Sequence, residues 1–159
     1  MVVAAEETHP MIRKILHDLG HGCEHPSAEG AVAFVLERAS SLRDRGGSAR
    51  GVFAGSAVIW PASGGTLASV EALARAIPGV PKQPVVGPPA ESLAGRVFDL
   101  AMRRRRFSRA GARPCPSAAG VERGSVGPML AAADAIRAGE ASVIAWPDSA
   151  GGAGSLEIR

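Results

Sequence analysis

Residues 30–36, Gly-Ala-Val-Ala-Phe-Val-Leu, form a nearly continuous apolar run. The run is short for a helix and has no polar side for water to face, so it predicts a strand. A strand without a polar face is typical of a sheet that is covered on both sides. The fold therefore has to place other layers of protein on either side of this strand.

Strands and helices alternate over the rest of the sequence, which indicates an α/β layer fold with a mostly parallel sheet. Further strands are predicted at residues 1–5, 48–60, 85–86, 141–146 and 155–159. Helices are predicted at residues 8–19, 67–77, 93–101 (running out into four arginines) and 128–137. Residues 40–47 are predicted to be a charged connector and residues 114–127 to be irregular. Two consecutive strands precede the first clear crossover helix, so the pattern is typical of a piece of a larger sheet.

Length and composition exclude several classes of protein. A chain of 159 residues is one domain, and 46% hydrophobic residues are too many for a disordered chain. No apolar run approaches the roughly 20 residues that cross a bilayer, and residues 1–7 lack the pattern of a secretory signal. Two cysteines, Cys23 and Cys115, are too few for a disulfide framework. We therefore expect a cytoplasmic protein with no membrane partner.

The densest group of possible metal ligands is formed by four residues, His17, His21, Cys23 and His25. Zinc prefers four such nitrogen and sulfur ligands in a tetrahedral array. However, glycines interrupt the predicted helix between these residues, and their spacing fits no common zinc-finger pattern. We expect a polar loop here, and we predict neither a metal nor a cofactor.

Part of the sequence resembles a known family. Residues 28–37, AEGAVAFVLE, followed by residues 42–46, LRDRG, resemble the "GEGAAAFVLE…ARARGA" segment of β-ketoacyl synthases and chain-length factors. These proteins are condensing enzymes of the thiolase superfamily. Residues 2–7, VVAAEE, are similar to the strand that follows the helix bearing the family's nucleophilic cysteine. Residues 129–159 are similar to the family's final helix and strand pair.

This resemblance implies a partial thiolase-like fold, layered α/β/α with a mixed sheet, within one domain of residues 1–159. Residues 1–60 correspond to the end of the family's N-terminal half and residues 61–159 to its C-terminal half. The cysteine-bearing helix and the first strands have no counterpart. The resemblance therefore implies that a second polypeptide, a ketosynthase-like N-terminal subunit carrying the cysteine, completes the fold in a hetero-oligomer.

The family's catalytic residues have no counterpart either. One family histidine lies in an "HGTGT" motif, where this chain has Val-Val-Gly-Pro-Pro-Ala-Glu at residues 85–91. The other lies in a "GHxxGAAG" motif, where this chain has Ser125. A serine hydroxyl cannot replace an imidazole as a proton carrier near neutral pH. We therefore predict a subunit that is not catalytic alone, in which Ser125 lies at the pocket.

The glycine-rich segment at residues 147–154 has two interpretations. By resemblance, Gly151 and Gly152 shape an acyl pocket or an oxyanion hole, where backbone N–H groups stabilise a developing negative charge. The same residues also suit a plain hairpin turn, which needs no function. The segment does not resemble a phosphate-binding loop, because it leads into a strand rather than a helix.

Positive charge gathers in one segment of the chain. Between Arg96 and Arg123 there are eight arginines and only two acidic residues. The simpler interpretation is a solvated helix end whose charge suits the helix dipole. The sharper interpretation is a docking site for an acidic acyl carrier protein. The residues of this predicted docking site are Arg103, Arg104, Arg105, Arg106 and Arg109. Nucleic acid is disfavoured because aromatic residues make up only 4% of the chain.

The sequence thus predicts a non-catalytic subunit of a split complex like a ketosynthase with its chain-length factor, in polyketide or fatty-acid-type biosynthesis. Its partners would be the cysteine-bearing subunit and acyl carrier protein. One alternative is a diverged thiolase-fold acyltransferase, in which Cys23 or Cys115 acts with a histidine of residues 17–25. Another is a free-standing binding module.

Overall fold

The computed structural model describes residues 1–6, 11, 14, 18, 30–79, 81–107, 111–115, 126–148 and 151–159. Of the helix predicted at residues 8–19, only Met11, Lys14 and Asp18 are described, and all three are helical. The predicted polar loop with its histidines and Cys23, the predicted pocket residue Ser125 and the predicted docking residue Arg109 lie outside the described residues.

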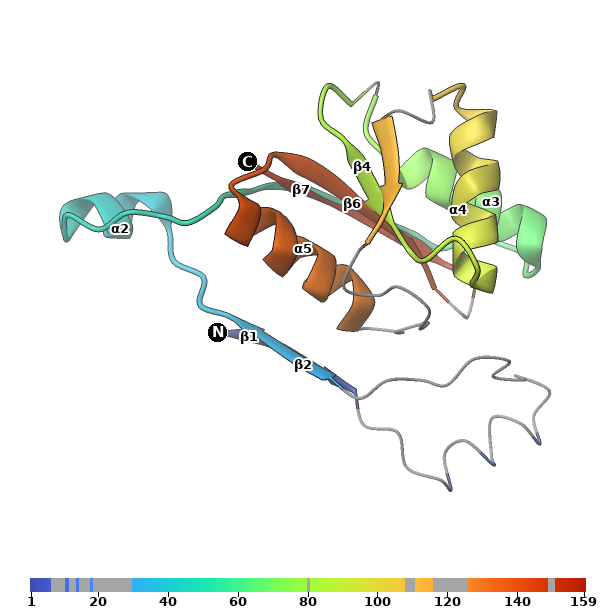
Figure 1. The fold of residues 1–159 in the computed structure, drawn as a ribbon, viewed down its shortest axis with the longest axis horizontal. Coiled ribbons are helices and arrows are strands. Elements are labelled where there is room, and N and C mark those ends of the chain that lie inside the picture. The colour runs from blue at the N-terminus through green and yellow to red at the C-terminus, as the bar shows by residue number, and fades with distance from the viewer. Residues whose placement is uncertain are drawn as a thin grey trace.

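Five strands form one mixed sheet (Figure 1). They are β3 (Phe53–Ile59), β4 (Val85–Gly87), β5 (Ala112–Pro114), β6 (Ser142–Pro147) and β7 (Ala153–Ile158). Their order in the sheet is β3-β7-β6-β4-β5. The strand β7 is antiparallel to both neighbours, β3 and β6, whereas β6, β4 and β5 are mutually parallel. Four strands thus run in one direction and β7 in the other, which confirms the predicted α/β fold with a mixed sheet.

Helices cover both faces of this sheet. One face is covered by α3 (Thr66–Ala76) and α4 (Leu93–Arg104), and the other by α5 (Val126–Ala138) (Figure 1). Because side chains alternate along a strand, Val143 of β6 packs towards α3 and α4, while Ile144 packs towards α5. The strand β6 is buried along its whole length, as its apolar sequence predicts. We call this sheet with its three helices the body.

A second, two-stranded sheet lies on the far side of α5 (Figure 1). It consists of β1 (Val2–Glu6) and β2 (Gly30–Phe34), which pair antiparallel with Val2 opposite Phe34. Both strands contact α5, so this helix is sandwiched between the body sheet and the two strands. We call the β1–β2 pair the ribbon. The described residues thus form four successive layers: α3 with α4, the five-stranded sheet, α5 and the ribbon.

The prediction for residues 40–47 was wrong, because a short helix, α2 (Ala39–Asp44), lies there. None of its residues is buried, so it lacks the apolar periodicity from which a helix is predicted. Local bonds close its C-terminal end: Gly46 has a φ of 69°, and the N–H of Gly47 donates to the carbonyl of Leu42 at 2.9 Å. The next strand, β3, begins only at Phe53, five residues later than residue 48, where we predicted it to begin.

No helix in the described part of the chain has the length and apolar character needed to cross a membrane.

Candidate functional site

Three parallel strands end at the same edge of the body sheet. They are β4, β5 and β6, which end at Gly87, Pro114 and Pro147. Ligands of open α/β sheets bind in crevices beyond the carboxyl ends of such strands. The turn that follows Gly87 and the glycine-rich segment that follows β6 both begin at this edge.

The segment after β4 is a tightly packed turn. Pro88 and Pro89 are fully buried, and a Cβ atom on Gly87 would lie 2.5 Å from the ring of Phe98. The hydroxyl of Ser92 donates to the carbonyl of Pro89 at 2.8 Å and accepts the N–H of Gly95 at 2.9 Å, which caps α4. The turn therefore positions a helix, and it holds no histidine.

The turn between β6 and β7 requires Gly151 for its backbone conformation and Gly152 for close packing. Gly151 has a φ of 97°, a region that favours glycine, and its N–H donates to the carbonyl of Asp148 at 3.1 Å. A Cβ atom on Gly152 would lie 2.7 Å from the ring of Trp60. Because the Gly151 N–H is bonded within the turn, an oxyanion at this position would have to displace that bond. The predicted role of Gly151 and Gly152 in an acyl pocket stays a prediction.

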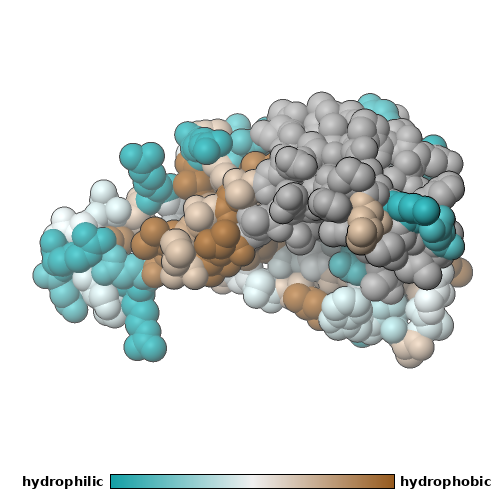
Figure 2. Space-filling model, turned by 90° about the horizontal axis from the view of Figure 1, so that it is seen from below, coloured by the Kyte–Doolittle hydropathy of each residue, from teal (hydrophilic) through white to brown (hydrophobic). Residues whose placement is uncertain are grey.

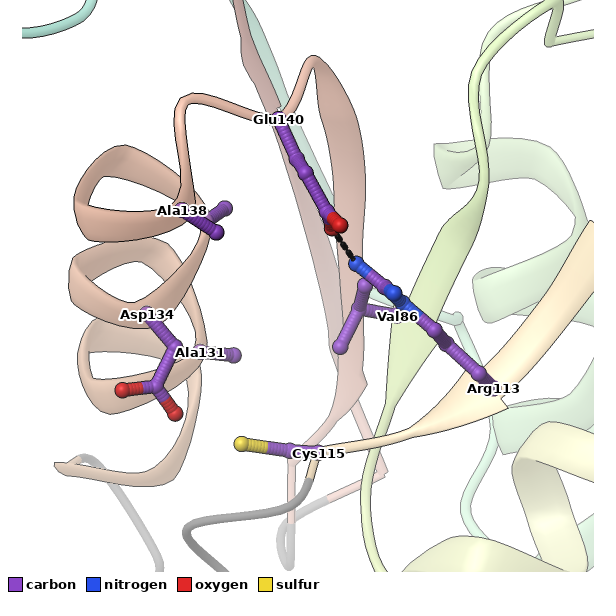
Figure 3. Close-up of a pocket in the computed structure, with 8 residues that line it drawn as sticks. Val86, Arg113, Cys115, Ala131, Asp134, Ala138 and Glu140 are labelled. Atoms are coloured by element: carbon purple, nitrogen blue, oxygen red, sulfur yellow. Dashed lines mark hydrogen bonds and ion pairs between the residues drawn. The ribbon is translucent and has the colours of Figure 1, made fainter.

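A pocket of about 180 Å³ lies between α5 and the edge formed by β4 and β5 (Figure 3). It is lined by Val86, Arg113, Cys115, Ala131, Asp134, Ala135, Ala138 and Glu140. The Cys115 sulfur points towards α5, and Arg113 forms an ion pair with Glu140 (Figure 3). Cys115 is only 1% exposed, and its N–H donates to the carbonyl of Gly87 at 2.8 Å.

This pocket is a poor environment for a nucleophilic thiolate. A reactive cysteine needs a cationic neighbour or a helix N-terminus, whereas Cys115 shares its pocket with the acidic residues Asp134 and Glu140. Arg113 is paired with Glu140, which offsets its charge. Cys115 is also almost fully buried, which keeps a substrate from reaching its sulfur. The geometry therefore supports a structural role for Cys115 over the role of nucleophile in the alternative acyltransferase.

A second, apolar groove of about 260 Å³ separates the ribbon from the body. It is lined by Val2, Phe34, Leu36, Phe53, Met129 and Leu156. The rings of Phe34 and Phe53 meet edge to face with centroids 5.5 Å apart, which ties β2 to β3. Sequence reasoning did not predict this groove, although the apolar run at residues 30–36 carried the signal for it.

The opposite face of the ribbon is apolar as well. Val3 is 54% exposed and Val35 is 87% exposed, and the exposed Ala31 and Ala33 lie on the same face. Figure 2 shows hydrophobic residues gathered beside α2, where the ribbon and the segment that follows it lie. The run at residues 30–36 thus has the covered inner face that the sequence predicts, but its outer face is open in the described part of the chain.

The predicted docking arginines at the end of α4 mostly contact the protein itself. Arg103 pairs with Asp99 at 2.7 Å, and Arg104 pairs with Glu71 of α3 at 2.8 Å. Arg105 donates to the carbonyl of Gly79, and its guanidinium lies 5.5 Å from the centroid of the Phe107 ring. Arg106 is exposed and has a φ of 56°, so it ends the helix in the left-handed region. These contacts fix the helix end, and docking at the arginines stays a prediction.

No protein-family model and no curated protein matches the sequence. Among solved structures, the chain is similar to one from a complex of a type II PKS acyl-carrier protein with its ketosynthase bound to the hexaketide (AntDE:AntF, apo). The TM-score is 0.61 with 15% identity over 98% of this chain. The chain spans about half (49%) of the length of that structure's matched chain. A likeness at this identity shows a shared fold, so it confirms the α/β architecture.

Proposed function

We propose that this chain is a non-catalytic subunit of a split complex like a ketosynthase with its chain-length factor, in polyketide or fatty-acid-type biosynthesis. Its role is to complete a layered fold together with a cysteine-bearing, ketosynthase-like subunit. The observation that carries the proposal is the ribbon, which is apolar on both faces and which the described residues cover on one face only.

A two-stranded sheet of this kind is unstable by itself. An isolated pair of strands is marginal in water, and strands that are apolar on both faces occur in sheets covered on both sides. In the described part of the chain, β1 and β2 pair only with each other, so each has one edge whose N–H and C=O groups lack a strand. A partner that adds strands at these edges and a layer over Val3 and Val35 would satisfy both requirements.

The resemblance and the structural similarity support the same kind of partner. The segment with the resemblance to ketosynthases, residues 28–37, includes β2. The matched chain comes from a complex that contains a ketosynthase, and this chain corresponds to half of it. A partner of the size of the remaining half would be large enough to cover the open face of the ribbon.

The proposed role is non-catalytic because both positions lack the histidines of the family that the sequence resembles. The turn after β4 holds Pro88 and Pro89, and Ser125 stands where the family has its second histidine. Ser125, Gly151 and Gly152 then belong to the walls of the acyl pocket. Arg106 and its neighbours at the end of α4 form the docking site for an acidic acyl carrier protein, which opposite charge would steer to the surface.

The test measures binding of a ketosynthase-like polypeptide that carries the cysteine-bearing helix, coexpressed with this chain. Val35→Asp, on the outer face of the ribbon, should abolish copurification, because an unpaired charge would be buried in the interface. Leu93→Asp is the matched control, because Leu93 is 62% exposed on α4, in the outermost layer on the far side of the body sheet from the ribbon. The control should copurify as the unsubstituted chain does.

Amide hydrogen exchange of the chain alone provides a second readout. Strands β6 and β7 should be protected and the ribbon should exchange fast, with protection of the ribbon appearing only in the complex. The proposal is wrong if the chain alone is a monomer that protects β1 and β2 as strongly as β6, or if Val35→Asp copurifies like the control.

A further inference from the structure

The outer edge of β3 is a second unfinished surface, independent of the ribbon. In the described part of the chain, β3 is the first strand in the sheet order and pairs with β7 alone. Its other edge therefore carries backbone N–H and C=O groups that no strand among the described residues meets. Such an edge is a template for another strand.

The register shows which backbone groups point to this edge. The N–H of Asp148 donates to the carbonyl of Gly152 at 2.7 Å, so alternation along β7 turns Gly154, Leu156 and Ile158 towards β6. The backbone groups of Ala153, Ser155 and Glu157 therefore point towards β3. The two backbone hydrogen bonds exchanged between Arg159 and Val52 agree with this alternation. Ala57 opposite Ser155 thus bonds to β7. Ser56 and Val58, on either side of Ala57, point their N–H and C=O groups to the outer edge.

The sequence of β3 does nothing to protect the edge. Natural edge strands carry lysine, other charges or proline that discourage pairing, whereas Phe-Ala-Gly-Ser-Ala-Val-Ile has none of these. Instead, β3 and the residue after it expose large apolar side chains: Val58 is 67% exposed and Trp60 is 66% exposed. Because side chains alternate, Ser56, Val58 and Trp60 lie on one face of the sheet, the face opposite to Ile59, which packs against the α3–α4 layer.

Two irregularities define the length of β3 that can pair with another strand. The register with β7 shifts between Phe53 and Gly55, which bends the strand there, and Pro61 has no N–H to donate. The regular stretch between them is residues 55–60, and its outward-facing residues are Ser56, Val58 and Trp60, with Val58 in the middle. A stretch whose outward groups are centred on one residue can pair antiparallel with an identical stretch, because each copy presents the same pattern to the other.

We propose that β3 is the strand through which two copies of this chain pair antiparallel, about a two-fold axis at Val58. Val58 then lies opposite Val58 of the partner subunit, and Trp60 lies opposite Ser56 of the partner subunit. The two body sheets join into one continuous sheet, and the four large apolar side chains at Val58 and Trp60 cover one another across the axis. The occupant is a second copy rather than a strand of another protein, because the pairing stretch is self-complementary and uncharged.

The experiment uses the full chain, in which Cys23→Ser leaves the buried Cys115 as the one native cysteine. In this background, Val58→Cys places a new cysteine at the proposed axis. Across a hydrogen-bonded antiparallel pair the Cα atoms lie about 5.5 Å apart, within the range that a disulfide spans. Mild oxidation should convert most of the protein into a covalent dimer of twice 16.2 kDa on a non-reducing gel. The control, Leu93→Cys in the same background, has a similar exposure on α4 and should stay monomeric on the gel.

Sedimentation velocity on the unoxidised protein gives the second readout. The unsubstituted chain should sediment with twice its monomer mass, Val58→Lys should sediment with the monomer mass, and Leu93→Lys should sediment as a dimer. The proposal is overturned if the chain is a monomer at every concentration tested, if both cysteine variants cross-link equally, or if Val58→Lys remains dimeric. These outcomes do not depend on the ribbon, so they are distinct from failure of the proposed function.

Discussion

Leu73 and Leu93 provide a matched pair for testing the body. Both are leucines in the helical layer of α3 and α4, but Leu73 has no exposed surface and Leu93 is 62% exposed. Replacing each by alanine removes the same atoms and changes helix propensity by the same small amount. Any difference between the two variants therefore reports burial of the side chain against the sheet.

The structure sets the expected size of this difference. Truncating a fully buried leucine loses the transfer free energy of its methyl and methylene groups and leaves a cavity, so Leu73→Ala should lower the free energy of unfolding by about 3 kcal/mol. Leu93 keeps only about a third of its surface covered, so Leu93→Ala should cost less than about 1 kcal/mol. A difference of about 2 kcal/mol corresponds to about 4–8 °C in Tm for a domain of this size.

Urea unfolding followed by far-ultraviolet circular dichroism measures both variants, at one fixed protein concentration because any dimer makes the stability depend on concentration. The body is expected to unfold cooperatively, since Leu73 contributes to a core shared by α3, α4 and the face of the sheet that they cover. Equal effects of the two substitutions, or a loss below about 1 kcal/mol for Leu73→Ala, would show that the helices do not pack on the sheet as described.

Two further predictions concern single contacts. Gly95→Ala should destabilise the protein, because a Cβ atom there would lie 1.9 Å from the carbonyl oxygen of Pro89. A strain of about 1–3 kcal/mol then outweighs the roughly 1 kcal/mol that alanine gains in a helix, and a thermal melt showing stabilisation would contradict this. The hydrogen bonds from Arg45 hold the pKa of the Glu37 carboxyl below its ordinary value. The ion pair therefore stabilises the fold at a pH above the ordinary carboxyl pKa. This stabilisation is lost as the pH falls through the lowered pKa of Glu37. Carbon NMR titration should show the pKa of Glu37 return upwards in Arg45→Gln, and an unchanged titration would show that the ion pair is absent in solution.

The body could be predicted from the sequence because its elements have strong local patterns. The apolar run that became β6 is buried on both faces, and Val70 and Leu73 of α3 face the core, where Leu73 is fully covered. The helix α4 follows from the same periodicity, and its cap by Ser92 is a standard N-terminal signal. In these elements local preference and tertiary packing agree, so the periodicity of apolar residues was sufficient to predict them.

Other features depend on contacts that local sequence does not encode. The helix α2 buries no side chain and is closed by Gly46 and by the pairing of Glu37 with Arg45, so it has no apolar period. The strand β5 has only three residues and pairs with β4 through the backbone. The apolar groove depends on the approach of Phe34 to Phe53, which are far apart in sequence. The ion pairs of the predicted docking arginines likewise depend on where α3 and α4 meet.

The two unfinished surfaces need different kinds of partner, and this difference separates the two proposals. The ribbon needs an apolar layer over exposed side chains such as Val35 and also strands at its two open edges, and a folded half-domain offers both. The outer edge of β3 presents backbone N–H and C=O groups, which only another strand can satisfy in a regular array. One partner cannot substitute for the other, because a second copy paired at β3 supplies no layer for the outer face of the ribbon, and a partner at the ribbon leaves the edge of β3 unpaired. If both proposals hold, the assembly contains two copies of this chain joined at β3, each with its own ribbon completed by a separate ketosynthase-like subunit.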